Sequence, residues 1–294
     1  MAIFKGVGVA LITPMNPDGS VNYDKLSEIL EQQIAGGTDC ILICGTTGEA
    51  STMSEDEHMD VIRYAIEKVN HRIPVIAGTG SNCTETAIKL SVQAEKAGAD
   101  GLLLVTPYYN KATQGGLIRH FEAIAKSVSI PCVLYNIPSR TGVTIQPETM
   151  AYLYKNVENI VGVKDATGNI SMSTKLMSLV DEDFCLYSGD DDEVIPLLSL
   201  GGSGVFSVLS NIAPREVHEM CAKWFAGDVK GALKEQLRAY DLIKALFSEV
   251  NPIPVKAAMN LMGMNVGPLR LPLTEMEPEN QTKLREEMVK YGLL

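Results

Sequence analysis

One lysine stands at the end of an apolar run in NIVGVKDATG, residues 159–168. Alternation along a strand would divide this run between two faces, with Ile160, Gly162 and Lys164 on one and Val161, Val163 and Asp165 on the other. If the valines pack against helices, Lys164 points inward, Gly162 leaves room for its stem, and Asp165 points away. Burial lowers the pKa of a lysine from about 10.4, and a neutral amine can form a Schiff base with a ketone. We therefore predict a nucleophilic amine at Lys164; the alternative is a lysine that extends along the surface into solvent.

Other side chains that can transfer protons follow neighbouring apolar runs. Tyr135 ends the run PCVLY, and its phenol, which titrates near about 10, can exchange a proton with an amine or an alcohol. Thr46 and Tyr109 follow two further runs and can pass protons onward to water. The sequence thus predicts a relay of hydroxyls beside Lys164. The alternative for Tyr135 is a packed ring with its hydroxyl capped.

Two stretches are suited to binding carboxylates. The backbone amides of Thr46, Thr47 and Gly48 can form a nest for one carboxylate. Arg140 lies in a loop bounded by proline and glycine, and its guanidinium can bind a second carboxylate through two hydrogen bonds. We therefore expect ligands that carry carboxylates. The alternatives are a tight turn at 46–48 and a solvated charge at Arg140.

The elements that must position these residues are short apolar runs at steady intervals. Each run consists mostly of Val, Ile and Leu without clean polar alternation, which is typical of strands buried on both faces of a parallel sheet. The runs are residues 6–13, 40–45, 74–80, 101–107, 131–136, 159–164, 184–189 and 204–210.

Segments of helical period separate the runs. Residues 22–37 end at two glycines, as helices often do, and place four apolar residues on one face: Leu26, Ile29, Leu30 and Ile34. Ser54 and Glu57 predict a capping box at the start of the next helix. Residues 84–98 and 117–128 repeat the helical pattern.

Eight strand–helix units predict an α/β fold, a (β/α)8 TIM barrel over residues 1–225 with a C-terminal helical appendage over 226–294. The alternative, a doubly wound open sheet, needs a glycine-rich nucleotide loop after the first strand, where the chain reads LITPMNPDGS. In such a barrel the C-terminal ends of the strands carry the chemistry. This fold would therefore gather Lys164, Tyr135 and Thr46 at one end of the barrel.

Charge and hydropathy exclude several classes of protein. The net charge is −11 and no basic cluster is present, so nucleic acids and anionic membranes are not expected as partners. No apolar run reaches the about 18 residues of a membrane-spanning helix, and the apolar start of the chain lacks the basic region of a signal peptide.

Cofactor and metal signals are weak. GTGSN at 78–82 lacks the GK[ST] ending of a phosphate loop, and the acidic run at 188–194 is better explained as the opening of a helix than as a metal cluster. The six cysteines lack metal-ligand spacing, so we expect free thiols in a reducing cytoplasm. These patterns therefore predict neither a phosphate loop nor a metal cluster.

Five motifs, one at each of five strand ends, are specific in combination. They are GTTGE at 45–49, PYYNK at 107–111, YNIPSRTG at 135–142, GVKDATG at 162–168 and SGDD at 188–191. Over nearly its whole length the chain resembles the dihydrodipicolinate synthases of the N-acetylneuraminate lyase superfamily of class I aldolases. The resemblance implies condensation of pyruvate with L-aspartate-4-semialdehyde to 4-hydroxy-tetrahydrodipicolinate, in diaminopimelate and lysine biosynthesis. It also implies a cytoplasmic lyase, commonly a homotetramer built as a dimer of dimers, that needs no metal or organic cofactor.

The resemblance further implies a role for each site residue. Lys164 would form the imine with pyruvate, and the proton relay would consist of Tyr135, Thr46 and Tyr109, the last contributed across a dimer interface. The substrate-binding residues would be Thr47 for the pyruvate carboxylate, Arg140 for the semialdehyde carboxylate, and Gly189 and Phe206 along the pyruvate pocket.

One departure concerns the lysine-feedback site of the family. The corresponding residues are Ala50, Ser51, Glu55, His58, Asn82, Thr86 and Tyr108. Glu55 stands where sensitive enzymes carry a histidine, and Thr86 stands where they carry a glutamate. Because loss of that glutamate removes a partner for the ammonium group of the effector, we expect weak or absent inhibition by lysine.

Two other functions fit many of the same residues. A sugar-acid aldolase, of the N-acetylneuraminate or keto-deoxygluconate lyase type, would keep Lys164 and Tyr135. Arg140 and Tyr109 favour the semialdehyde, because it needs a carboxylate clamp whereas a sugar chain needs more hydroxyl partners. A non-catalytic keto-acid-binding barrel would keep Lys164 but would turn nothing over.

Overall fold

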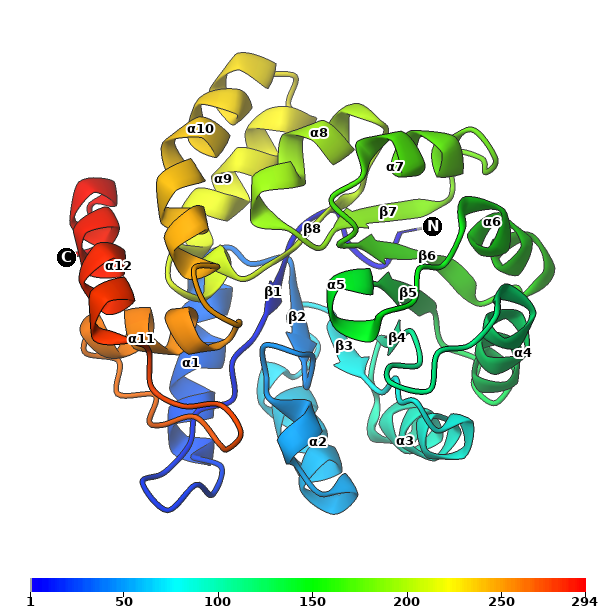
Figure 1. Cartoon of the computed structure of the whole chain (residues 1–294), viewed down its shortest axis with the longest axis horizontal. Coiled ribbons are helices and arrows are strands. Elements are labelled where there is room, and N and C mark those ends of the chain that lie inside the picture. Colours follow the sequence, from blue (N-terminus) through cyan, green and yellow to red (C-terminus); the bar gives the residue numbers. More distant parts are fainter. Residues whose placement is uncertain (1) are drawn as a thin grey trace.

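Eight parallel strands close into a barrel in the computed structural model, which describes residues 2–294 (Figure 1). Each strand pairs with the next along the chain, and β1 pairs with β8 to complete the ring. The strands are β1 Gly6–Ala10, β2 Cys40–Ile43, β3 Val75–Gly78, β4 Gly101–Val105, β5 Cys132–Asn136, β6 Ile160–Asp165, β7 Cys185–Ser188 and β8 Gly204–Ser207. The predicted (β/α)8 barrel is confirmed, and each of the eight apolar runs coincides with one strand, although β6 extends one residue beyond its run to Asp165.

Helices surround the barrel, and three more follow it (Figure 1). Those between or directly after the strands are α1 Tyr23–Ala35, α2 Glu55–Val69, α3 Thr84–Ala97, α4 Gln114–Ala125, α5 Pro138–Thr141, α6 Pro147–Asn156, α7 Ile170–Met177, α8 Val194–Ser199 and α9 Pro214–Phe225. The later ones are α10 Val229–Leu246, α11 Ile253–Leu261 and α12 Pro278–Tyr291. The predicted C-terminal helical stretches are therefore present, and we retain the division between residues 1–225 and 226–294 as a proposal.

The predicted helix starts and faces are largely present. In α1, Leu26, Ile29 and Leu30 are fully buried, whereas Ile34 is only half-buried. At the start of α2 the Ser54 side chain accepts a hydrogen bond from the Glu57 amide, as a capping box requires. The second hydrogen bond of the predicted capping box, from the Ser54 amide to the Glu57 side chain, is wrong. The Glu57 carboxylate is instead bound by a distant arginine described below.

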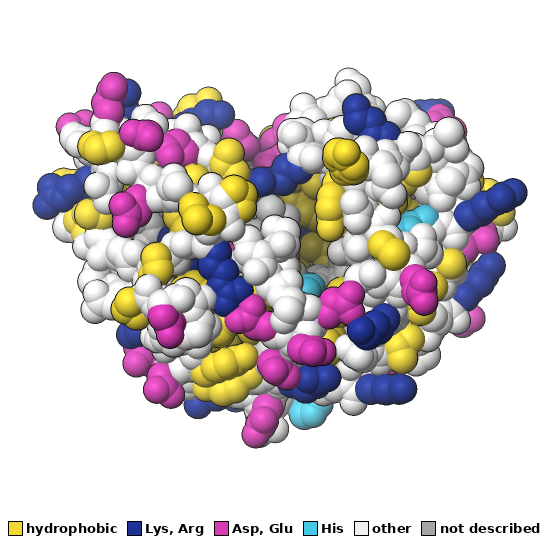
Figure 2. Space-filling model, turned by 60° about the horizontal axis from the view of Figure 1, so that its bottom comes forward, with side chains coloured by type: hydrophobic (Ala, Val, Ile, Leu, Met, Phe, Trp, Pro, Cys, Tyr) yellow, Lys and Arg dark blue, Asp and Glu magenta, His cyan; other side chains and the backbone are white. Residues whose placement is uncertain are grey.

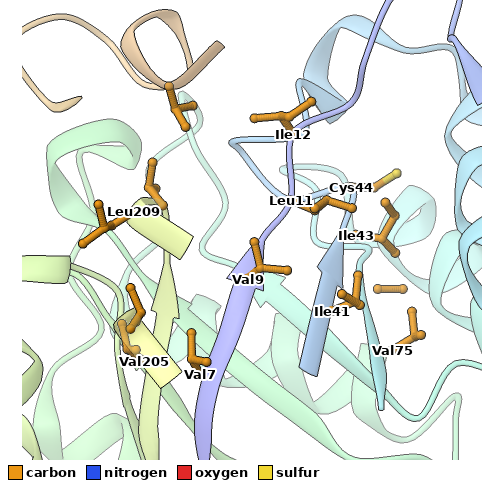
Figure 3. Packing of buried hydrophobic residues seen from close by; sticks show 14 of the residues in the cluster. Val7, Val9, Leu11, Ile12, Ile41, Ile43, Cys44, Val75, Val205 and Leu209 are labelled. Atoms are coloured by element: carbon orange, nitrogen blue, oxygen red, sulfur yellow. The ribbon is translucent and has the colours of Figure 1, made fainter. Parts of the chain in front are cut away.

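Apolar residues form two cores on either side of the strands. The larger fills the space between barrel and helices and includes Val7, Val9 and Ile41, which lie along β1 and β2 in Figure 3. The smaller lies inside the barrel and includes Leu42, Tyr187 and Phe206. Because both faces of each strand are buried, the polar groups able to do chemistry are confined to the strand ends.

Strand β6 departs from the predicted alternation near its start. Its register against β5 shifts, so that Cys132 pairs with Ile160 and Val133 pairs with Gly162, which leaves Val161 as an extra residue. Ile160 consequently belongs to the outer core, and Val161 packs against the inner one. The prediction that Ile160 shares a face with Lys164 was wrong, although the inward direction of Lys164 was right.

Candidate active site

Lys164 lies at the C-terminal end of β6 with its side chain inside the barrel. It is 5% exposed, and its Nζ lies 4.2 Å from the centroid of the Tyr135 ring and 5.6 Å from that of Phe206. Pairing of β5, β6 and β7 sets Tyr135 and Tyr187 level with Lys164 on either side. An amine in this position is largely removed from water.

Burial sets the electrostatic state of this amine. It lowers the pKa of Lys164 to about 8, against a smaller opposing effect of Asp190 and Asp191. Asp165 makes no ion pair with the lysine, because its carboxylate accepts from Ser173 Oγ and from the Thr167 amide. Burial also raises the pKa of Asp190 to about 7. A substantial fraction of Lys164 is therefore neutral near pH 8.

The rate at which Lys164 forms an imine with pyruvate should depend on pH accordingly. Only the neutral amine attacks a ketone, so the rate should rise about tenfold per pH unit below pH 8 and level off above it. Borohydride trapping of the adduct at a series of pH values between about 6 and 10 measures this rate. A profile that is flat from pH 6 to 8, or one that keeps rising steeply to pH 10, would contradict this assignment.

Glycine at position 189 makes space for the lysine. An added Cβ at Gly189 would lie 2.7 Å from Ala166 Cβ and 3.2 Å from Lys164 Cε. At Gly162 an added Cβ would instead lie 2.0 Å from the Cys185 carbonyl oxygen. The prediction that Gly162 makes room for the lysine stem was wrong: Gly162 allows β7 to approach, and Gly189 borders the lysine.

Tyr135 and Thr46 are brought together, whereas Tyr109 stands apart. Tyr135 is 5% exposed, and burial raises the pKa of its phenol, an effect that Arg140 and a hydrogen bond with the Thr46 side chain partly oppose. Tyr109 lies in the loop after β4 with φ of +71° and is 91% exposed. Of the three hydroxyls predicted to transfer protons, a single chain therefore brings together Tyr135 and Thr46.

The turn after β2 differs from the predicted nest of three amides. The Gly48 amide donates to the Gly45 carbonyl at 3.1 Å, so the amides of Thr46 and Thr47 remain for a ligand. The Thr47 side chain is buried, and its Oγ1 accepts from Asn251 Nδ2 at 2.9 Å. Arg140 Nη2 donates to the Asn251 backbone oxygen at 2.8 Å. Asn251 was missed, since no motif around it signals a contact with a turn 204 residues earlier.

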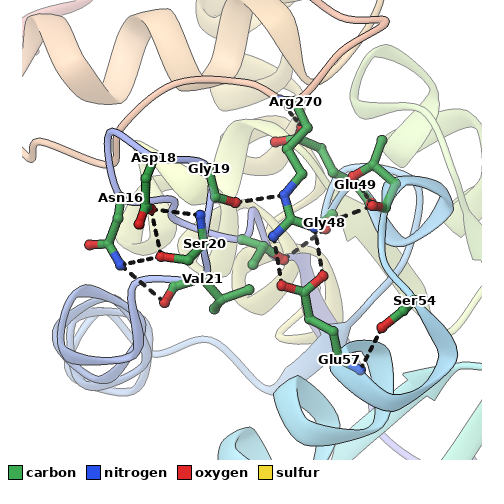
Figure 4. A network of polar contacts seen from close by, with 12 residues as sticks. Asn16, Asp18, Gly19, Ser20, Val21, Gly48, Glu49, Ser54, Glu57 and Arg270 are labelled. Atoms are coloured by element: carbon green, nitrogen blue, oxygen red, sulfur yellow. Dashed lines mark hydrogen bonds and ion pairs between the residues drawn. The ribbon is translucent and has the colours of Figure 1, made fainter.

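A buried ion network fixes this turn to the C-terminal helices. Lys256 Nζ lies 2.7 Å from Glu49 Oε1, and both side chains are fully buried. Glu49 Oε2 accepts from the Arg270 amide at 2.9 Å, and the Arg270 guanidinium binds both oxygens of Glu57 at 2.6 Å (Figure 4). Charges desolvated to this extent are held only with complete partners, so the turn and the C-terminal segment are fastened to each other.

A cleft of about 380 Å³ opens at the ends of β2 to β5. Thr46, Tyr135 and Arg140 line it, and so do residues at the predicted feedback site: Ala50, Ser51, Glu55, His58, Thr86 and Tyr108. Lys164 is not a lining residue and adjoins the cleft through Tyr135, while Phe206 is fully buried within the barrel. Figure 2 shows a face of the molecule that is hollowed between two lobes, with charges of both signs around it.

Metal-binding clusters and membrane-spanning helices are absent from residues 2–294. No group of three or more His, Cys, Asp or Glu side chains in this range is arranged to hold a metal ion. The acidic run forms a short 3-10 turn, Asp191–Glu193, ahead of α8, and Asp191 Oδ2 accepts from the Val208 and Leu209 amides. All six cysteines are free thiols. None of the helices in these residues has the length and apolar character needed to cross a membrane.

Comparison with known proteins gives full-length matches. The sequence profile of the dihydrodipicolinate synthetase family (DHDPS) matches residues 3–290. The 4-hydroxy-tetrahydrodipicolinate synthase of Lachnoclostridium phytofermentans is 58% identical over 294 residues, which cover 100% of both chains. The chloride-inhibited dihydrodipicolinate synthase of Acinetobacter baumannii, solved with pyruvate, has a TM-score of 0.96 at 44% identity over 99% of this chain and 100% of that one. The DHDPS of Cyanidioschyzon merolae, solved with lysine bound, has a TM-score of 0.97 at 41% identity over 100% of both chains.

Proposed function

The chain belongs to the dihydrodipicolinate synthetase family, and on this premise we propose that it condenses pyruvate with L-aspartate-4-semialdehyde. Its activity is that of a 4-hydroxy-tetrahydrodipicolinate synthase, a lyase of diaminopimelate and lysine biosynthesis. The observation that carries the chemistry is the buried Lys164 amine 4.2 Å from the centroid of the Tyr135 ring. Burial of the amine and the adjacent phenol support covalent catalysis by Lys164.

The proposed reaction starts with attack of the neutral Lys164 Nζ on the keto carbon of pyruvate. Loss of water gives a protonated imine, which acts as an electron sink, so that the pyruvate methyl group loses a proton and an enamine forms. The enamine carbon attacks the aldehyde of the second substrate, whose oxygen takes up a proton. The amine of that substrate then attacks the imine carbon, closes the ring and releases Lys164. Tyr135, joined to Thr46, is the group proposed to donate and accept protons in these steps.

A turnover assay with several aldehydes tests this function directly. Purified protein is supplied with pyruvate and either L-aspartate-4-semialdehyde or an aldehyde acceptor of the sugar-acid aldolases, and pyruvate consumption is followed. We expect turnover with the semialdehyde and at most trace turnover with the sugar aldehydes. Faster turnover of a sugar aldehyde would favour a sugar-acid aldolase. Trapping of pyruvate on Lys164 without turnover would favour a non-catalytic keto-acid-binding barrel.

Replacement of Arg140 by alanine should weaken binding of the semialdehyde far more than that of pyruvate. We propose that its guanidinium, which adjoins the cleft and is held by Asn251, binds the carboxylate of the semialdehyde. Loss of a bidentate charged contact should raise the KM for the semialdehyde about 100-fold and that for pyruvate about threefold or less. Steady-state kinetics with each substrate varied measures both values. The control is Arg119→Ala on the exposed face of α4, and equal effects of Arg140→Ala on both substrates would count against the assignment.

Lysine should inhibit the enzyme weakly or not at all. Glu55 is paired with Lys89 at 2.6 Å, so a cation already occupies its carboxylate. His58 Nε2 lies 2.8 Å from the Gly78 carbonyl, and burial lowers the pKa of its ring, so it carries no charge for an effector carboxylate. Titration of lysine against initial rate measures the effect, and half-inhibition below about 1 mM would refute this expectation.

We also propose a homotetramer built as a dimer of dimers, with Tyr109 entering the site of a neighbouring subunit. Two sets of exposed apolar side chains support two kinds of interface. Tyr109 and Leu271 are 91% and 80% exposed, and Leu237 on α10 is 65% exposed beside Leu233 and Tyr240. Cytoplasmic location is proposed as well, and the free thiols of all six cysteines support a reducing compartment. Sedimentation analysis of the purified protein tests the assembly.

A further inference from the structure

Asn251 connects two residues that are proposed to bind different substrate carboxylates. It lies between α10 and α11 and is 7% exposed. Its side-chain Nδ2 donates to Thr47 Oγ1 at 2.9 Å, and its backbone oxygen accepts from Arg140 Nη2 at 2.8 Å. We propose that Asn251 is a positioning residue for pyruvate, which fixes the Thr47 hydroxyl as a hydrogen-bond donor to the pyruvate carboxylate. The inference rests on the proposed function and assigns a specific task to a residue outside the five strand-end motifs.

The direction of the hydrogen bond to Thr47 carries the argument. A threonine hydroxyl has one proton and accepts through its lone pairs. Because the Asn251 amide donates to Oγ1, the hydroxyl proton points elsewhere, and among residues 2–294 the Thr47 hydroxyl donates no hydrogen bond. A carboxylate oxygen of a ligand held by the amides of Thr46 and Thr47 is a suitable acceptor. Thr47 is then available as a third donor in the same turn.

The Asn251 side chain makes one polar contact in buried surroundings. Among residues 2–294 its side-chain hydrogen bond is the one from Nδ2 to Thr47 Oγ1, and its buried Oδ1 has no partner. No second partner within these residues turns the amide away from Thr47, so the bond from Nδ2 to Oγ1 is the one that orients the threonine side chain.

A second contact keeps Asn251 at this turn. Glu49, two residues after Thr47, pairs with Lys256, five residues after Asn251, and this pair is fully buried. The two segments are thus joined at two points, so that the Asn251 amide faces Thr47 without needing pyruvate to hold it there. Preorganised donors avoid the cost of ordering at the moment of binding.

Substitution at Asn251 distinguishes this role from support of the fold. Asn251→Asp keeps the size of the side chain but replaces the donor by a carboxylate, which would accept the Thr47 proton and repel pyruvate. We expect the KM for pyruvate to rise about 100-fold with kcat reduced no more than about threefold. Asn251→Ala and Thr47→Val should each raise the KM for pyruvate about tenfold. The double variant should have the same KM as Thr47→Val alone, because Asn251 acts through Thr47. Asn260→Asp on α11, which also loses a side-chain donor, is the matched control and should leave both constants unchanged.

The outcomes separate this inference from the proposed function. Steady-state kinetics and borohydride trapping at varied pyruvate are measured on the full-length protein, with thermal unfolding recorded for each variant. If the unsubstituted chain fails to turn over, the proposed function fails first. If it turns over but Asn251→Asp leaves the KM for pyruvate unchanged, or the two single substitutions add fully in the double variant, the role of Asn251 is overturned. Should Asn251→Ala unfold, Asn251→Asp and Asn251→Ser supply the same comparison.

Discussion

Lys164→Met should abolish turnover and leave the barrel folded. Methionine is apolar and of similar length, so it fills the space beside Tyr135 and Phe206 without a nucleophile. Because each proposed intermediate is attached to Nζ, kcat should fall by at least about 10⁴-fold. Turnover with both substrates, together with peptide mapping after borohydride reduction in pyruvate, measures the effect. The unsubstituted chain should carry the adduct on the peptide that contains Lys164, and the variant should carry none.

The same substitution should also stabilise the protein at neutral pH. Burial lowers the pKa of Lys164 from 10.5 to about 8, so between these values the unfolded chain binds a proton that the folded chain does not. Unfolding free energy of the unsubstituted protein therefore rises with pH across this window, and below pH 8 the folded state must hold a desolvated charge. Lys164→Met lacks this cost. Its unfolding free energy should therefore exceed that of the unsubstituted protein fully at pH 7, and the difference should disappear as the pH rises from about 8 to 10.5.

Lys175→Met is the matched control for both measurements. Lys175 lies on the exposed face of α7, so its replacement should alter neither the adduct nor turnover. An adduct that persists in Lys164→Met, or activity within about tenfold of the unsubstituted protein, would remove Lys164 from the chemistry. If Lys164→Met lost activity because it unfolds, the thermal transition would show this. Lys164→Arg, which retains the positive charge, would then be tested in place of Lys164→Met.

The positions of the site residues at the strand ends could be predicted from the sequence. The apolar runs determine where strands end, and in a closed parallel barrel all strand ends of one kind meet at one rim. That argument alone sets Lys164 beside Tyr135, and Thr46 on the same rim. It succeeds because it depends on local periodicity and on a topology with few alternatives.

The parts that depend on contacts between distant segments could not be predicted in this way. The register shift between β5 and β6 exchanges the faces of Ile160 and Val161, and nothing in their apolar types signals it. The roles of Gly162 and Gly189 depend on which neighbouring backbone or side chain approaches each of them. The bond from Asn251 to Thr47 spans 204 residues and depends on where the C-terminal segment docks. Such contacts are determined by packing, which periodicity does not encode.

Tyr135→Phe should lower kcat by about 10²- to 10⁴-fold while the KM for pyruvate changes little. The phenol is buried, and burial raises its pKa, so it is protonated across the neutral range and able to act first as an acid. Phenylalanine keeps the ring against Lys164 Nζ but removes the proton that the hydroxyl shares with Thr46. Steady-state kinetics and the rate of borohydride-trapped imine formation measure the loss at separate steps.

Tyr187 provides an unusually close control, because it too faces the barrel interior and pairs in register with Lys164 from the other side. Its hydroxyl donates to the Phe4 carbonyl at 2.9 Å and stays within the core. Tyr187→Phe should therefore cost about 1 kcal/mol of stability and leave kcat within about threefold. Equal losses of kcat in both variants would mean that loss of a tyrosine hydroxyl anywhere inside the barrel slows the reaction by disturbing the packing. A loss confined to Tyr135→Phe ties the proton transfers to the one phenol that contacts both the amine and Thr46.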